Sequence, residues 1–476
     1  MTGSSQVSNR REQQFLGRDP IGRLIFRFAI PSIISMMVNA AYNITDQIFI
    51  GQQVGMLGNA ATNIAFPMTT LTIALSLLMG IGTAANLNIS IGAQRPEEGI
   101  RYVGTGLTLT AILSVCHLLV LVLFQEPLLY LCGVTSEILP YARDYFSLTA
   151  LGLPLLLFSN ASSNIIRADG SPTYSMFCVV TGALVNVVLD ALFMLVFHWG
   201  IRGAAAATLI GQALSFFLCV IYFPRFRSVK LSGRAFGIRL RYALSIVQTG
   251  LSGGINLGVM MLVNIVMNRT LSHYGALSPF GREIPLAVSG VIAKLNSILS
   301  AFSVGLAQGC QPIWGYNYGA GKIHRVKETY LKAASVALGV SMSAFFLFQL
   351  FPRQIVSIFG GGEENYFIFA ERYMRIFMAL VGVFGVQPLS VTFFSATENI
   401  RQGVFLSITK QGLVLLPLLL LLPRRMGLDG VLIAGPVSDC IAFLLSVSLV
   451  LFSFRRMADR ADARAAKKGD GDERHL

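Results

Sequence analysis

The 476-residue chain carries little charge and few residues that commonly bind metals or form disulfides. Asp, Glu, Lys and Arg together make up only 13% of it, about half the share of a typical soluble domain. Its five histidines are scattered, and its six cysteines show no paired spacing. These shortages argue against a soluble globular fold, a metal centre and a disulfide framework. No cofactor is expected.

Long apolar runs take the place of the missing charge. The chain is 54% hydrophobic, with a mean hydropathy of +0.65. Twelve runs are long enough to cross a bilayer core of about 30 Å as helices. The sequence therefore predicts an all-α polytopic membrane protein whose spans are 24–50, 57–82, 102–124, 142–166, 173–197, 203–224, 242–270, 285–313, 329–351, 367–395, 403–422 and 430–453.

The net charge of +14 has a topological explanation. If the N-terminus is cytoplasmic, most of the Lys and Arg residues fall in loops on the same side, above all in 225–241. The positive-inside rule then predicts a multi-pass protein of the plasma or inner membrane with both termini in the cytoplasm. We expect contact with anionic lipid and no nucleic-acid partner. The tail 455–476 is predicted to be solvated and disordered.

An internal repeat divides the chain in two. Gly82 and Gly309 begin related segments, as do Gly200 and Gly427, and the two pairs have the same separation in the sequence (309 − 82 equals 427 − 200). The alternative is that small residues recur only because they let helices pack closely. The repeat predicts two six-helix bundles related by a pseudo-twofold axis along the membrane normal. The expected parts are a tail (1–20), an N-terminal lobe (21–224), a linker (225–241), a C-terminal lobe (242–454) and a second tail (455–476).

Two carboxylates stand inside predicted spans of the first half. Asp190 lies in the run 173–197, four residues after Asn186 and therefore on the same helix face. Asp46 lies in the first span. A carboxylate at the centre of a membrane helix costs about 2.5–3.5 kcal/mol on insertion scales. Such a cost favours an ion-coupling role for these two residues. The alternative is that each is a structural carboxylate that accepts hydrogen bonds from donors at a helix end. The repeat places Pro417 opposite Asp190, so ion chemistry is expected in the N-terminal lobe.

Three long motifs resemble the multidrug and toxic compound extrusion family. They are "YNITDQIFIG" from Tyr42, "NVVLDALFMLVFHWGIRGAAAATLIGQ" from Asn186 and "GLAQGCQPIWGYNYGAGKIHRVKET" from Gly305. The resemblance, which covers the whole chain, implies two bundles around a V-shaped cleft. It also implies export of organic cations driven by H⁺ or Na⁺. The coupling residues that it implies are Asp46, Tyr145, Asn186, Asp190 and Thr208.

In the second half, the resemblance leaves the site less defined. Some family members have carboxylates where this chain has Met260 and Gln387, which puts a cation site there in doubt. Asp439 could line the C-terminal lobe or simply pack with a polar neighbour. Lys294 could tune that cavity or repel cations from it. Lys410 is predicted to extend its ammonium group towards the cytoplasmic surface.

The leading hypothesis is a secondary active exporter of small cationic molecules, which we expect to be a monomer. The alternative is a flippase for a lipid-linked precursor, which should need cationic residues in its central cavity. A receptor or scaffold would leave the buried carboxylates without a function. An enzyme is not expected, because "GLSGG" from Gly250 lies in an apolar span and lacks the strand–turn–helix setting of a nucleophile elbow.

Overall fold

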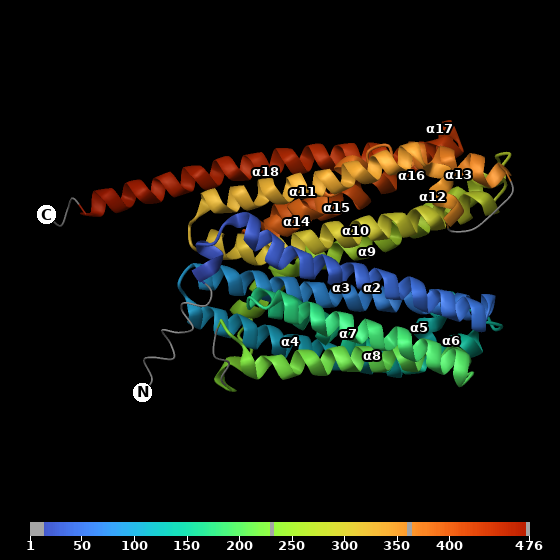
Figure 1. The fold of residues 1–476 in the computed structure, drawn as a ribbon, viewed down its shortest axis with the longest axis horizontal. Coiled ribbons are helices and arrows are strands. Elements are labelled where there is room, and N and C mark those ends of the chain that lie inside the picture. The colour runs from blue at the N-terminus through green and yellow to red at the C-terminus, as the bar shows by residue number, and fades with distance from the viewer. Residues whose placement is uncertain (1–13, 229–232, 359–363, 473–476) are drawn as a thin grey trace.

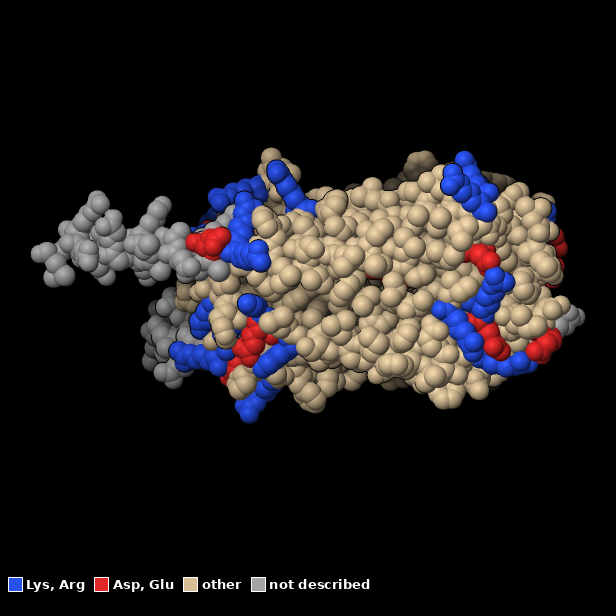
Figure 2. All heavy atoms as spheres, turned by 90° about the horizontal axis from the view of Figure 1, so that it is seen from above, with Lys and Arg blue, Asp and Glu red and all other residues tan. Residues whose placement is uncertain are grey.

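The computed structural model describes residues 14–228, 233–358 and 364–472. Within these ranges the chain is helical and contains no strand. Eleven helices are long and apolar enough to cross a membrane, or up to twelve if one bent pair counts as a span. Figure 2 shows Lys, Arg, Asp and Glu gathered at the two ends of the molecule, with a broad belt of other residues between them. The predicted all-α membrane fold is confirmed.

The N-terminal half forms one bundle, which we call the N-lobe. Pro96 and Pro172 stand in the first turns of two of its helices, where a missing N–H group costs no hydrogen bond. Its elements are η1 (Gln14–Gly17), α2 (Ile21–Gln53), α3 (Met56–Gly92), α4 (Pro96–Leu123), α5 (Gln125–Leu131), α6 (Leu139–Ala168), α7 (Pro172–Asp190), η2 (Ala191–Val196) and α8 (Gly200–Tyr222).

The C-terminal half forms the second bundle, the C-lobe, which lies alongside the N-lobe in Figure 1. Two short turns, η3 (Phe223–Arg225) and η4 (Gly233–Phe236), precede it. Its elements are α9 (Leu240–Ala276), α10 (Glu283–Gly319), α11 (Ile323–Leu350), α12 (Pro352–Ile358), α13 (Glu364–Phe377), η5 (Val381–Val383), α14 (Val386–Ala396), α15 (Ile400–Ile408), η6 (Thr409–Leu415), α16 (Leu416–Leu421), α17 (Pro423–Met426) and α18 (Leu428–Asp472).

The internal repeat is visible in the helix boundaries. Helices α3, α4 and α5 acquire the bounds of α10, α11 and α12 after one common shift in residue number (283 − 56), which is also the separation of the repeated glycines. Gly200 and Gly427 make the same turn, with φ angles of 57° and 58° that favour glycine. The starts of α2 and α9 are related by a slightly smaller shift (240 − 21).

Two segments depart from the sequence-based expectation. The predicted span 367–395 is a bent pair in which α13 meets the segment Val381–Ala396 at 45°. The prediction of a disordered tail is wrong for 455–472, because α18 continues as a helix to Asp472 and projects from the bundle.

The lobes contact each other near one end of the molecule, which we call the terminal face. It carries the start of α2, the α3–α4 turn and the α10–α11 turn. Close to it, hydrogen bonds cross between the lobes: Asn86 Nδ2 donates to Thr249 Oγ1 (3.2 Å) and Arg167 donates to Gln308 Oε1 (2.7 Å).

Glycines allow the helix backbones to meet there. A Cβ atom on Gly92 would lie 2.0 Å from the carbonyl oxygen of Tyr316, and one on Gly319 would lie 2.1 Å from that of Ile89. Gly92 and Gly319, which the repeat relates, form what we call the glycine seam. Only residues without a side chain permit this approach.

Candidate functional site

Asp190 is the last residue of α7 and is fully buried. The six residues after it form the π-helical segment η2, and π-turns commonly mark functional sites. Neither carboxyl oxygen of Asp190 has a hydrogen-bond donor among the residues that the structure describes, and Oδ1 of Asp46 also lacks one. A buried carboxyl without donors is costly unless it holds a proton or a cation.

Asp46, on α2, faces Asp190, and the two carboxyl groups lie within hydrogen-bonding reach of each other. Two ionised carboxylates at this separation repel strongly, so one of the pair readily retains a proton. The arrangement can therefore bind and release a proton, or hold a small cation between the two groups.

The other predicted residues lie in the same part of the N-lobe as this carboxyl pair. Asn186 Nδ2 donates to Thr208 Oγ1 (3.3 Å), which links α7 to α8. Tyr145 lies within electrostatic range of Asp46 and Asp190. The structure thus brings all five predicted residues of the N-lobe into one cluster.

One member of the cluster was missed in the sequence. Tyr42 lies within electrostatic range of both carboxyl groups and of Tyr145. It stands four residues before Asp46, on the same face of α2. This spacing could have identified it, since Tyr42 and Asp46 belong to the same motif, "YNITDQIFIG".

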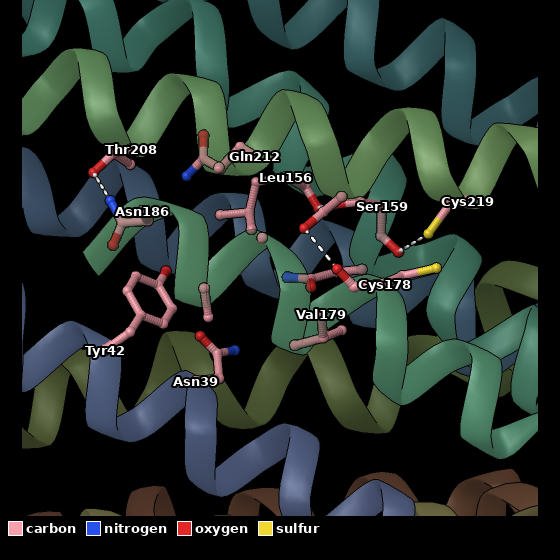
Figure 3. Close-up of a pocket in the computed structure, with 15 residues that line it drawn as sticks. Asn39, Tyr42, Leu156, Ser159, Cys178, Val179, Asn186, Thr208, Gln212 and Cys219 are labelled. Atoms are coloured by element: carbon pink, nitrogen blue, oxygen red, sulfur yellow. Dashed lines mark hydrogen bonds between the residues drawn. The ribbon is translucent and has the colours of Figure 1, made fainter. Parts of the chain in front are cut away.

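A pocket opens beside the cluster in the N-lobe (Figure 3). Tyr42, Asn186 and Thr208 belong to both the cluster and the pocket wall. The remaining wall comes from α2, α6, α7 and α8 and carries amide, hydroxyl and thiol groups, including those of Asn39 and Gln212. None of the residues that line the pocket is charged at neutral pH.

The C-lobe contains a different polar centre. Lys410 Nζ lies 2.7 Å from Asp439 Oδ1 in a nearly buried ion pair, and 4.1 Å from the centre of the Phe384 ring. The prediction that Lys410 extends to the surface is therefore wrong, because the carboxylate of α18 satisfies its charge inside the lobe. Of the two interpretations of Asp439, packing with a polar neighbour is the one that the geometry favours.

The two remaining C-lobe candidates lie apart from the carboxyl cluster. Gln387 is buried on α14 and donates from Nε2 to the carbonyl oxygen of Leu406 (3.2 Å). Lys294 lies on α10 with an exposed side chain. No group of three or more His, Cys, Asp or Glu residues suited to a metal occurs among the described parts of the chain.

Comparison with known proteins decides the family. The family model MatE matches residues 31–192 and 255–421, which include both lobes. The chain belongs to the MatE family. It is a multi-pass membrane transporter and not an enzyme, as the sequence predicted.

The chain is also similar to named relatives of the family. It shares 25% identity over 436 residues with the FAD transporter of Shewanella oneidensis, covering 89% of this chain and 92% of that protein. It shares 23% identity over 442 residues with the multidrug export protein MepA of Staphylococcus aureus, covering 92% and 95%.

Solved structures of MATE transporters share the fold. One in an outward-facing conformation superposes with a TM-score of 0.87 at 21% identity, covering 94% of this chain and 99% of the other. A MATE structure in a bent conformation gives a TM-score of 0.86, also at 21% identity.

Proposed function

We propose that this MatE-family transporter is a secondary active exporter that exchanges H⁺ for small organic cations by alternating access. The observation that carries the proposal is the pair formed by Asp46 and Asp190. Their carboxyl groups lie together in the N-lobe, and no hydrogen-bond donor reaches either oxygen of Asp190 within the described residues. Such a pair binds a cation readily, and a proton is the smallest one.

The coupling ion is H⁺ rather than Na⁺. Two carboxyl groups this close share one proton readily, because both cannot be ionised without strong repulsion. In the C-lobe, Met260 and Gln387 stand where a second acidic site would be expected, and Gln387 already bonds to the backbone.

The substrate class follows from the chemistry of the N-lobe pocket. Its uncharged amide and hydroxyl groups, together with Tyr42, suit a cationic or neutral molecule with an aromatic body. The name of the relative MepA, a multidrug export protein, supports this class. The name of the relative from Shewanella oneidensis suggests FAD, but no Lys or Arg lines the pocket to hold a pyrophosphate.

The direction of transport depends on which face is cytoplasmic. The basic loops favour placing the terminal face, and with it both ends of the chain, in the cytoplasm. Because the lobes are in contact at that face, the conformation described here is closed towards the cytoplasm. A proton that enters the Asp46–Asp190 pair from outside then favours release of substrate outwards, and the protein works as a monomer.

The test is efflux of the fluorescent cation ethidium from cells that express the wild type or Asp190→Asn at matched membrane levels. Asp429→Asn is the matched control, because Asp429 is an exposed carboxylate that pairs with Arg372. We expect efflux from the wild type and the control and none from Asp190→Asn. Equal efflux from all three would assign Asp190 a structural role.

A second experiment identifies the coupling ion and the substrate. Proteoliposomes with an imposed pH gradient or sodium gradient should transport ethidium only with the pH gradient. Release of FAD from the same cells is measured alongside. FAD release without ethidium efflux would overturn the cation-exporter proposal in favour of an anionic substrate.

A further inference from the structure

A short segment before the first long helix crosses from the N-lobe to the C-lobe. Residues 15–19, which we call the strap, lie against the ends of α10 and α11 at the terminal face. Leu16 is fully buried and belongs to the same hydrophobic core as Trp314 and Tyr316 of the C-lobe. A Cβ atom on Gly17 would lie 2.9 Å from the Tyr316 ring, so the strap fits closely at this point.

Three C-lobe side chains fasten the strap through its backbone. Asn317 Nδ2 donates to the carbonyl oxygen of Leu16 (3.0 Å), and Lys322 Nζ donates to that of Gly17 (2.8 Å). Arg325 donates to the carbonyl oxygens of Leu16 (3.1 Å) and Asp19 (2.6 Å). The Nε of Arg325 also donates to Asn317 Oδ1 (3.1 Å), so Arg325 and Asn317 hold the strap together.

The strap leads directly into a helix that serves both lobes. Ile21, Leu24 and Phe28 at the start of α2 are buried in the C-lobe core. Asp46, farther along the same helix, faces Asp190 in the N-lobe. Helix α2 therefore links the carboxyl pair to the contact between the lobes, and the strap anchors its near end.

The repeat produces a second crossing segment, which precedes the C-lobe and packs against the N-lobe. The turn η4 follows η1 at the same offset in residue number that separates α9 from α2 (233 − 14 equals 240 − 21). It leads into the C-lobe but rests on α4 of the N-lobe. Thr105 and Thr108 donate there to the carbonyl oxygens of Gly237 (3.3 Å) and Phe236 (3.0 Å). Crossing to the opposite lobe is thus a repeated feature of the fold.

We propose that the strap is a latch that holds the terminal face closed, and that Arg325 and Lys322 are the positioning residues that fasten it. To separate at this face, the lobes must break the bonds to the strap or bend α2 between Phe28 and Asp46. Pro31, whose missing N–H weakens the helix there, lies in this interval. The latch rests on the proposed alternating-access cycle.

The test is amide hydrogen exchange of the full chain in nanodiscs, without substrate or an ion gradient. Lys322→Gln/Arg325→Gln removes the two cationic fasteners. Lys327→Gln/Arg401→Gln is the matched control, because both residues are exposed at the same face. We expect exchange at least about tenfold faster in the strap and in the glycine seam of the first variant, with no change in the control.

The exchange rates distinguish a strap that holds the two lobes together from one that is only attached locally to the C-lobe. Faster exchange in the strap alone would overturn the latch, because the lobes would then stay closed without it. Unchanged exchange throughout would show that the two residues do not fasten the strap. Arg325→Lys, which keeps the charge but lacks the guanidinium fork, is the second variant if the double variant fails to fold. Since no transport is measured, these results are independent of the coupling ion and the substrate.

Discussion

At the scale of single residues, the carboxyl pair predicts a non-additive mutant series. Asp46→Asn and Asp190→Asn should each reduce proton-driven transport at least about tenfold, because either change removes the shared proton site. The double variant should be no worse than either single variant. Transport into proteoliposomes under a pH gradient measures all three. Losses that multiply in the double variant would mean that the two carboxyl groups act separately.

Asp169 predicts a pH effect outside the membrane spans. It lies in the α6–α7 loop and accepts hydrogen bonds from Tyr222 Oη (2.6 Å) and the backbone N–H groups of Arg227 (2.8 Å) and Ser228 (2.6 Å). Burial raises the pKa of its carboxyl from 3.8 to about 6, although these hydrogen bonds oppose the shift. Its contribution to stability is therefore fully present below pH 3.8 and is lost as the pH rises through about 6.

The measurement is the Tm of the wild type and Asp169→Asn in detergent at pH 7 and pH 5. The wild type should gain stability relative to the variant as the pH falls, because protonation removes the cost of the buried charge. The amide introduced by Asp169→Asn does not titrate, so any change in the Tm of the variant between the two pH values comes from other groups. Subtracting that change from the change in the wild type isolates the effect of Asp169. A difference in Tm that is the same at both pH values would contradict the raised pKa.

At the scale of helical elements, the ion pair between Lys410 of η6 and Asp439 of α18 predicts compensation. Removing one partner, as in Lys410→Met, leaves a buried charge unpaired and should destabilise the protein by about 3–5 kcal/mol. Lys410→Met/Asp439→Leu should recover most of this loss, since an apolar pair of similar volume needs no desolvation of charge. Thermal unfolding of the three proteins checks this. A double variant as unstable as the single would assign the pair a role beyond mutual neutralisation.

At the scale of the whole molecule, the glycine seam predicts which glycines the closed state needs. Gly92→Ala and Gly319→Ala should each separate the lobes at the terminal face, because the added Cβ atom would overlap a carbonyl oxygen of the other lobe. Gly339→Ala is the control, since a Cβ atom there would meet nothing within 4 Å. Hydrogen exchange near the seam should rise only in the first two variants. Equal exchange in all three would place the contact between the lobes elsewhere.

Much of the fold could be predicted because its signals are local. Apolar runs of bilayer length specify the spans, and the recurrence of glycines at one fixed offset reveals the two bundles. Within the site, Asp46 and Asp190 are conspicuous because a charge in an apolar run is costly. The bend in 367–395 was missed, although Glu371, Arg372 and Arg375 already set its polar first arm apart from the apolar second arm.

The sequence by itself determined the all-helical membrane fold, its division into two related halves and the concentration of buried carboxylates in the first half. Each of these follows from the hydrophobicity and spacing of neighbouring residues. Only the tertiary structure decided that Lys410 pairs with Asp439, that Tyr42 joins the cluster and that the strap crosses to the opposite lobe. Such contacts depend on how each helix is rotated and packed. π-turns and close glycine contacts determine this rotation and packing, whereas the hydrophobic pattern of the sequence does not.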